Sequence, residues 1–265
     1  MCEGKVAIVT GSTKGIGHAI AKALVQRGAS VIITSRSLLS AQEAAKALQT
    51  LTITASQRVM GCEYNIEDQT NHRNLIKFAV DNFATLDILV NNAISQNCTA
   101  PLEVLTDEQI LTAITTNIGN TLLLTRAAYP LLKDSLGVVL NIGSVIVNRH
   151  LQDLALYAIV KGAIQQMTKA LASDWAADKI RVNAINPGFI RTAAFADMGM
   201  PNEIIDKSYE FYKSYCPLGA VGEPSQLETL AAFLVSDQAR FITGSSMDVD
   251  GGYSVKSLPL FQIDN

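Results

Sequence analysis

The sequence predicts an α/β fold in which a doubly wound parallel sheet of about seven strands carries helices on both faces. Short β-branched runs alternate with longer segments of helical spacing along the chain, which is typical of βαβ units. Several runs are apolar on consecutive residues, as in strands buried on both faces. The 265 residues contain no internal repeat, charge block or Pro/Ser-rich linker, so we expect one domain over residues 1–265.

The strands are expected where β-branched and aliphatic residues gather between turn residues. In chain order the runs are Val6–Thr10, Val31–Thr34, Arg58–Glu63, Ile88–Val90, Val138–Ile142, Val182–Ile185 and a last one near Met247–Val249.

Helices are expected between these strands. Ile16, Ile20, Ala23 and Leu24 share one face of the first helix, and Gly28 should end it with a glycine cap. The later apolar periodicity predicts helices at about 39–50, 68–83, 107–132, 155–176 and 224–236.

Two of these helices have start signals, and one segment breaks the alternation. Thr106 and Asp107 should cap the helix that begins near 107, and Pro224 suits the start of the last helix. Residues 193–216 form either a lid over a partly apolar substrate, which we favour, or a subunit interface. Their aromatic and methionine residues are Phe195, Met198, Met200, Tyr209, Phe211, Tyr212 and Tyr215.

Composition excludes several classes of protein. Only 17% of the residues are charged and the formal net charge is −3, which argues against a nucleic-acid-binding surface. With 48% hydrophobic residues the chain is too apolar to be disordered. No run approaches the roughly 18 uninterrupted apolar residues of a membrane span.

The sequence also bears on the compartment and on metals. The first expected strand follows Met1 almost at once, which leaves no signal peptide in these residues. The four cysteines form no CxxC pair and the three histidines are not clustered, so neither a zinc site nor a disulfide framework is expected. Reduced thiols in a cytoplasmic protein are the expectation.

A glycine-rich turn lies between the first strand and the first helix. It reads Thr10-Gly11-Ser12-Thr13-Lys14-Gly15-Ile16-Gly17. Such glycines let the backbone approach a pyrophosphate, and the helix N-terminus offers free N–H groups and a positive dipole end. The alternative is an ordinary tight turn. Because this turn follows an apolar strand and opens a periodic helix, we favour a dinucleotide-binding turn, as in a Rossmann fold.

The residues after the second strand indicate which dinucleotide binds. A carboxylate there would hold the ribose 2′-hydroxyl of NAD, but this chain has Ser35 and Arg36. The Arg36 guanidinium can form paired hydrogen bonds with a 2′-phosphate, and Lys14 could reach the same group. Either cation alone could be an ordinary surface charge, but together they favour NADP(H) over NAD(H).

A tyrosine and a lysine are spaced for acid–base catalysis. Tyr157 and Lys161 lie four residues apart, so on a helix their side chains share a face. A nearby cation should lower the phenol pKa, which is ordinarily about 10. Ser144, at the end of the fifth strand, could bind a substrate oxygen. Asn117 falls within the expected helix 107–132, where a buried asparagine needs partners.

At this point the sequence resembles the short-chain dehydrogenase/reductase family in its single-domain form. The resemblance runs from Lys5 to about Gly252. The motifs that carry it are the turn Thr10–Gly17, Asn91-Asn92-Ala93, Asn117, Ser144, Tyr157, Lys161, the stretch Asn186–Thr192, Pro217-Leu218-Gly219, Gly222-Glu223-Pro224 and Asp250-Gly251-Gly252.

The resemblance implies a mechanism. A hydride passes from NADPH to a carbonyl carbon, Tyr157 protonates the oxygen and Ser144 orients it. Lys161 lowers the tyrosine pKa and holds the nicotinamide ribose, while Asn117 positions a water that relays protons. The resemblance implies that the glycine turn, Ser35 and Arg36 bind the cofactor. It implies the same for a further set: Asn65, Ile66, Asn92, Ala93, Tyr157, Lys161, Pro187, Gly188, Ile190 and Thr192.

Two positions depart from the family pattern. Ile94 stands where the family usually has glycine, so the backbone is strained if φ is positive there; otherwise the side chain alters the cofactor floor or the substrate entrance. Asn65 stands in the place of an aspartate that accepts from the adenine amino group, and its amide oxygen can still accept. Ile66 would supply a backbone N–H to the adenine.

Three functions remain open from the sequence. The first is reduction of a ketone or 3-oxoacyl-type substrate with NADPH. The second is oxidation of a secondary alcohol or sterol with NAD(P)+, and the third is a catalytically silent NADP-binding sensor or scaffold, which only Ile94 favours. In this family the helices at 107–132 and 155–176 pack between subunits, so the resemblance also implies a homodimer or homotetramer.

Overall fold

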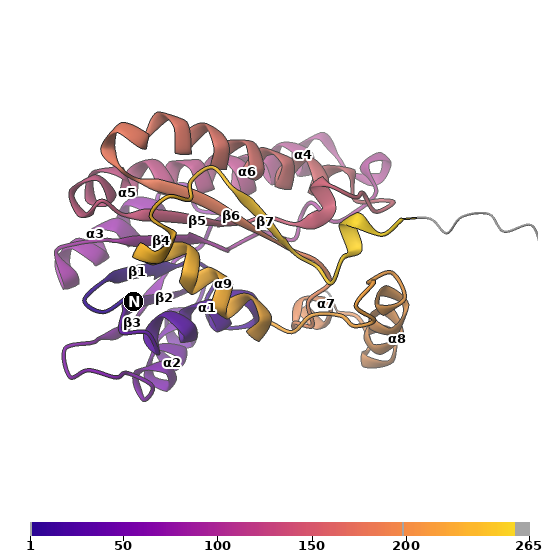
Figure 1. The fold of residues 1–265 in the computed structure, drawn as a ribbon. Coiled ribbons are helices and arrows are strands. Elements are labelled where there is room, and N and C mark those ends of the chain that lie inside the picture. The colour runs from indigo at the N-terminus through magenta and orange to yellow at the C-terminus, as the bar shows by residue number, and fades with distance from the viewer. Residues whose placement is uncertain (1, 198, 258–265) are drawn as a thin grey trace, which may run out of the picture.

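The computed structural model describes residues 2–197 and 199–257 and has the predicted architecture (Figure 1). Seven parallel strands form one sheet in the order β3-β2-β1-β4-β5-β6-β7. The strands are β1 (Val6–Val9), β2 (Ser30–Ser35), β3 (Val59–Glu63), β4 (Ile88–Asn91), β5 (Val138–Ile142), β6 (Arg181–Pro187) and β7 (Ser246–Val249). The order reverses between β1 and β4, which is where ligands bind in sheets of this kind.

Helices cover both faces of the sheet, as expected. One face carries α1 (Gly15–Val25), α2 (Leu38–Gln49) and α9 (Ser225–Val235). The other face carries α3 (Asn71–Phe83), α5 (Thr121–Ser135) and α6 (Ala155–Asp174), with α4 (Asp107–Ile114) beside α6.

Burial on both faces explains the apolar runs in the sequence. Ala7 and Val9 of β1 point into the core on the α1 side, whereas Ile8 points into the core on the α3 side. Ile8 is in register with Ile32 on one side and Leu89 on the other, and all three are fully buried. Each such side chain contributes about 1.5–3 kcal/mol relative to an exposed one.

The predicted signals at the helix ends are confirmed. Gly28 has a φ of +97°, and its N–H donates to the Val25 carbonyl while the Ala29 N–H donates to that of Leu24. These two bonds form a Schellman motif that closes α1. At the start of α4, the Thr106 hydroxyl accepts from the Gln109 N–H, and the Gln109 side chain accepts from the Thr106 N–H. This reciprocal pair is a capping box.

The single helix expected at 107–132 is wrong. The chain forms α4, then a π-helical segment at Thr115–Asn120, and then α5. A π turn widens the helix by one residue and redirects its side chains. Here two asparagines of the segment bond to two different loops: Asn117 to the loop after β4 and Asn120 to the loop after β3.

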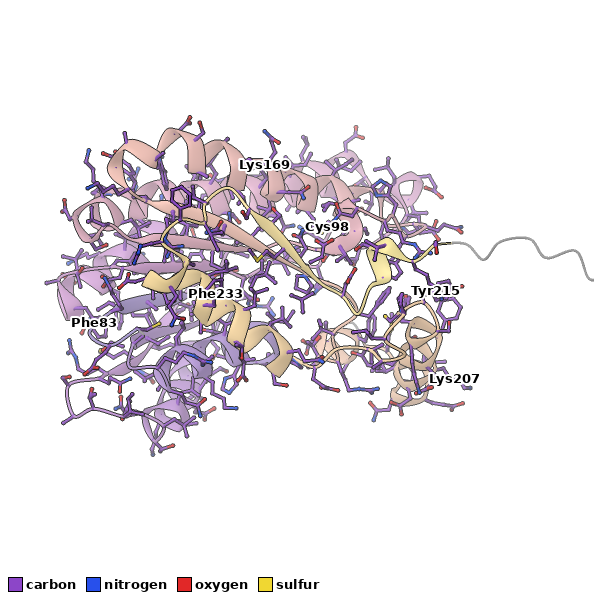
Figure 2. The ribbon with its side chains drawn as sticks, in the orientation of Figure 1. Phe83, Cys98, Lys169, Lys207, Tyr215 and Phe233 are labelled. Carbon is purple, nitrogen blue, oxygen red and sulfur yellow. The ribbon has the colours of Figure 1, made fainter. Side chains whose placement is uncertain are left out.

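Residues 193–216 lie beyond the carboxyl ends of the strands. They form α7 (Ala194–Asp197) and α8 (Asn202–Lys213), which project from the body in Figure 1. Lys207 and Tyr215 mark this projection in Figure 2. Met198, which the sequence places in the aromatic set, lies outside the described residues. In the part of the chain that the structure describes, no helix combines the length and apolarity needed to cross a membrane.

Candidate active site

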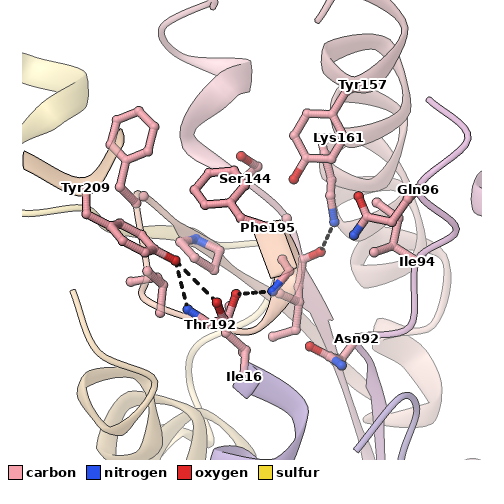
Figure 3. A pocket seen from close by; sticks show the side chains of 17 residues that line it. Ile16, Asn92, Ile94, Gln96, Ser144, Tyr157, Lys161, Thr192, Phe195 and Tyr209 are labelled. Carbon is pink, nitrogen blue, oxygen red and sulfur yellow. Dashed lines mark hydrogen bonds between the residues drawn. The ribbon is translucent and has the colours of Figure 1, made fainter. Parts of the chain in front are cut away.

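A cavity of about 270 Å³ opens where the strand order reverses. It brings together residues that the sequence singled out from five regions: the N-terminus of α1, the loop after β4, the loop after β5, the start of α6 and the loop after β6 (Figure 3). Its lining includes Ile16, Asn92, Ile94, Gln96, Ser144, Tyr157, Lys161, Pro187, Gly188, Ile190, Thr192, Phe195 and Tyr209.

The glycine turn is fixed against the loop after β4. The Asn92 side-chain amide donates to the Thr10 and Gly11 carbonyls at 2.8 and 3.0 Å. A Cβ at Gly17 would lie 2.5 Å from both that amide nitrogen and the Gly11 oxygen, so only glycine fits. Gly11 has a φ of +61°, which favours glycine for a second reason. This bare backbone before the α1 N-terminus fits a pyrophosphate.

The two cations expected to select the cofactor have different surroundings. Arg36 follows β2 and is exposed. Lys14 is exposed too, but its ammonium forms an ion pair with Asp197 of α7 at 2.6 Å. The sequence analysis missed Asp197, because no local pattern connects positions 183 residues apart.

The loop after β3, where the sequence resemblance implies adenine binding, has an additional anchor. Asn65 accepts the Glu67 N–H at 3.1 Å, and its oxygen retains a second lone pair. The Ile66 carbonyl accepts from the buried Asn120 side chain at 2.7 Å. Sequence analysis did not assign a role to Asn120, because the π turn that aims it at Ile66 was not foreseen.

Tyr157 and Lys161 share one face of α6, as their spacing predicts. The Lys161 ammonium lies 5.8 Å from the centre of the Tyr157 ring and donates to the Ile142 carbonyl at 2.9 Å. Ser144 lies two residues after the end of β5, and its hydroxyl accepts the Ile146 N–H at 3.3 Å. Figure 3 shows Ser144, Tyr157 and Lys161 facing the same cavity.

The expected lowering of the Tyr157 pKa is wrong for this structure. Burial raises the pKa of Tyr157 to about 12, and the facing Ser144 hydroxyl opposes this rise without reversing it. Burial also lowers the pKa of Lys161 to about 8. Burial is thus the main cause of both pKa shifts, and near neutral pH Tyr157 is a protonated phenol.

Asn117 has the partners that a buried asparagine requires. Its side-chain oxygen accepts the Ser95 N–H at 2.8 Å, and its amide donates to the Ser95 carbonyl and the Asn97 side chain at 3.3 Å. The Asn117 carbonyl accepts from the Thr121 hydroxyl at 2.9 Å. A separate cavity of about 10 Å³, the size of one water, lies between Asn117, Thr121 and Lys161.

Ile94 introduces no backbone strain. In the described chain the non-glycine residues with positive φ are Ala84, Leu136, Asp153 and Lys179, and Ile94 is not among them. Its side chain lines the cavity beside Gln96, which the sequence analysis did not single out (Figure 3). Ile94 therefore changes the wall of the site.

The loop after β6 closes the cavity opposite α6. A Cβ at Gly188 would lie 2.7 Å from the Asp250 Cα, so the backbones approach closely here. Ile190 forms a bridge with Gly222, and the Thr192 main chain is bonded to the Tyr209 hydroxyl of α8. Tyr209 was expected only as one of the lid aromatics.

The comparison with protein families agrees with this geometry. A family model described as enoyl-(acyl carrier protein) reductase matches residues 11–254. The chain belongs to the short-chain dehydrogenase/reductase family. This match confirms the family, and the structure confirms the fold, that the sequence resemblance implies for this dehydrogenase/reductase.

Individual relatives of this dehydrogenase/reductase cover nearly its full length. Tropinone reductase-like 3 of Erythroxylum coca is 38% identical, over 94% of this chain and 93% of its own. A 3-oxoacyl-(acyl-carrier-protein) reductase of Haemophilus influenzae is 33% identical, over 94% and 98%. The structure of a 3-ketoacyl-(acyl-carrier-protein) reductase from Brucella melitensis complexed with NADH has a TM-score of 0.84 and 31% identity, over 96% and 100%.

Proposed function

We propose that this protein reduces a ketone or 3-oxoacyl-type substrate with NADPH. The observation that carries the proposal is the convergence of Ser144, Tyr157 and Lys161 on one cavity at the reversal point of the sheet. The protonated state of Tyr157 near neutral pH supports a role as general acid in the reductive direction.

The roles of the residues follow from their positions. When bound, the reduced nicotinamide supplies the hydride. Ser144 holds the carbonyl oxygen by a hydrogen bond, and Tyr157 transfers its phenolic proton to that oxygen. The charged Lys161 stabilises the phenolate that remains. A water held in the small cavity beside Asn117 would pass protons to and from Lys161.

NADP(H) is the proposed cofactor, with Arg36 as the main ligand of the 2′-phosphate. Arg36 is exposed at the end of β2, where a carboxylate would instead select NAD. The ion pair between Lys14 and Asp197 weakens the contribution of Lys14. The Brucella structure holds NADH, which bears on the choice of cofactor. Our second candidate, oxidation of an alcohol or sterol with NAD(P)+, would use the same residues in the reverse direction.

The substrate we propose is compact, uncharged and partly apolar. Among the described residues that line the cavity, Lys161 is the one charged side chain, and Ile94, Phe189 and Phe195 provide apolar walls. Residues 193–216 would act as its lid, since Phe195 and Tyr209 face the cavity. The names of the relatives, a tropinone reductase-like protein and a 3-oxoacyl reductase, are consistent with ketone reduction.

We further propose a cytoplasmic homodimer or homotetramer. Leu111 of α4 and Ile159 of α6 are 64% and 56% exposed, although both are large apolar residues. Contact with a second copy would remove this apolar surface from water.

The test is a panel of ketones and 3-oxoacyl thioesters, with oxidation of NADPH followed by absorbance and NADH run in parallel. Wild-type protein should reduce at least one carbonyl, and Tyr157→Phe should reduce that turnover by at least about 100-fold. Nucleotide binding without turnover of any carbonyl or alcohol would favour the silent sensor. Full turnover by the phenylalanine variant would refute Tyr157 as the acid.

A further inference from the structure

Tyr209 is the buried aromatic residue of α8. Its side chain is 3% exposed, whereas those of Phe211 and Tyr215 are 57% and 36% exposed. The Arg191 guanidinium lies 4.3 Å above the Tyr209 ring, and the Phe195 ring lies 5.5 Å away. The ring is thus held from two sides, which fixes the direction of its hydroxyl.

That hydroxyl bonds twice to one residue of the loop after β6. It accepts the Thr192 N–H at 3.1 Å and donates to the Thr192 carbonyl at 3.3 Å (Figure 3). Tyr209 is therefore bound to both main-chain polar groups of Thr192. No sequence neighbour provides these bonds, since Tyr209 lies 17 residues further along the chain.

The side chain of Thr192 is oriented as a result. Its hydroxyl oxygen accepts the Ala194 N–H at 3.3 Å, so its own proton remains available to an acceptor in the cavity. Its methyl group faces the glycine turn, where a Cβ at Gly15 would come within 3.6 Å of it. Thr192 thus presents one donor from a fixed position to the space between the glycine turn and Tyr157.

We infer that Tyr209 is a positioning residue for the nicotinamide, acting through Thr192. The inference rests on the proposed function and on the family resemblance, which implies that Thr192 binds the cofactor; we assign this contact to the carboxamide of the nicotinamide. Supporting groups around a ligand hold such contacts in productive geometry. In this protein the support comes from α8. The Tyr209 hydroxyl therefore joins α8, which belongs to the proposed lid, to the loop after β6, which would bind the cofactor.

Tyr209→Phe tests the inference, because it retains the packed ring and removes both bonds. Dissociation constants are measured by calorimetry for two pairs of nucleotides: NADPH and NADH, which carry nicotinamide, and 2′-phospho-ADP-ribose and ADP-ribose, which lack it. We expect about 5- to 10-fold weaker binding of the first pair, consistent with loss of about one hydrogen bond, and no change for the second. Tyr215→Phe, in the same segment, is the control and should bind all four as wild type does.

Other outcomes overturn the inference. Equal weakening of both nucleotide pairs would mean that Tyr209 supports the fold of the site in general. Unchanged binding of both pairs would mean that Thr192 does not need the Tyr209 hydroxyl to hold its position. Thermal unfolding of Tyr209→Phe close to that of the control excludes a folding defect. If wild-type protein binds these nucleotides but turns over no carbonyl, the proposed reaction fails, while the comparison of the two pairs still decides the role of Tyr209.

Discussion

One added methyl group at Gly17 should strongly weaken cofactor binding. The Cβ of Gly17→Ala would lie 2.5 Å from the Asn92 amide nitrogen and 2.5 Å from the Gly11 oxygen. Neither atom can move freely, because the same amide bonds to the Thr10 and Gly11 carbonyls and so joins the glycine turn to the loop after β4.

The magnitude follows from these contacts. Overpacking of this kind costs about 1–3 kcal/mol, and loss of the two Asn92 bonds adds about 1 kcal/mol each. Because displacement of Asn92 moves the backbone that would hold the pyrophosphate, we expect affinity for NADPH to fall by at least about 100-fold. The same overpacking and lost bonds should lower the free energy of unfolding by about 3–5 kcal/mol.

Gly162→Ala is the matched control. Gly162 lies within α6, and an added Cβ there meets no atom within 4 Å. This variant should be more stable by up to about 1 kcal/mol, since alanine favours a helix, and should bind NADPH normally. Calorimetric binding and thermal unfolding of both variants provide the assay. Wild-type affinity in Gly17→Ala would refute the view that the dinucleotide lies on this turn.

Three further predictions concern charge and assembly. In reduction, kcat/KM should decrease above about pH 8, where Lys161 loses the charge that stabilises the Tyr157 phenolate; a pH–rate profile that stays flat to about pH 10 would contradict this. Asp197→Asn frees Lys14 and should strengthen binding of NADPH relative to NADH by about 2- to 5-fold at low salt; an effect that persists at high salt would not be electrostatic. Ile159→Arg places a charge on the proposed subunit contact, so the variant should form a smaller oligomer or a monomer. Size-exclusion chromatography with multi-angle light scattering measures this, and wild-type protein that is already monomeric would refute the contact.

Sequence patterns predicted the structural features that are determined by residues close together in the chain. The strand predicted at Val6–Thr10 and the cap at Gly28 depend on neighbouring residues; the strand is observed at Val6–Val9 and the cap is confirmed. The spacing of Tyr157 and Lys161 likewise placed both on one side of a helix.

The features that were missed depend on distant contacts. The π turn at Thr115–Asn120 coincides with side-chain bonds to loops far back in the chain, and helical periodicity has no signal for it. The ion pair between Lys14 and Asp197 joins the first turn to α7. The direction of the Tyr157 pKa shift was missed because it depends on how completely the fold excludes water from that site.

The π turn also makes two loops behave as one cooperative unit. Asn117 holds the loop at Ser95, and Asn120 holds the loop at Ile66. The Ser95 hydroxyl also bonds to Glu67 at 2.7 Å and links the two loops directly. Opening of either loop breaks a shared set of bonds, so their amide protons should exchange with solvent in common opening events. Six residues of helix thereby hold the loop after β3 and the loop after β4 in one fixed arrangement.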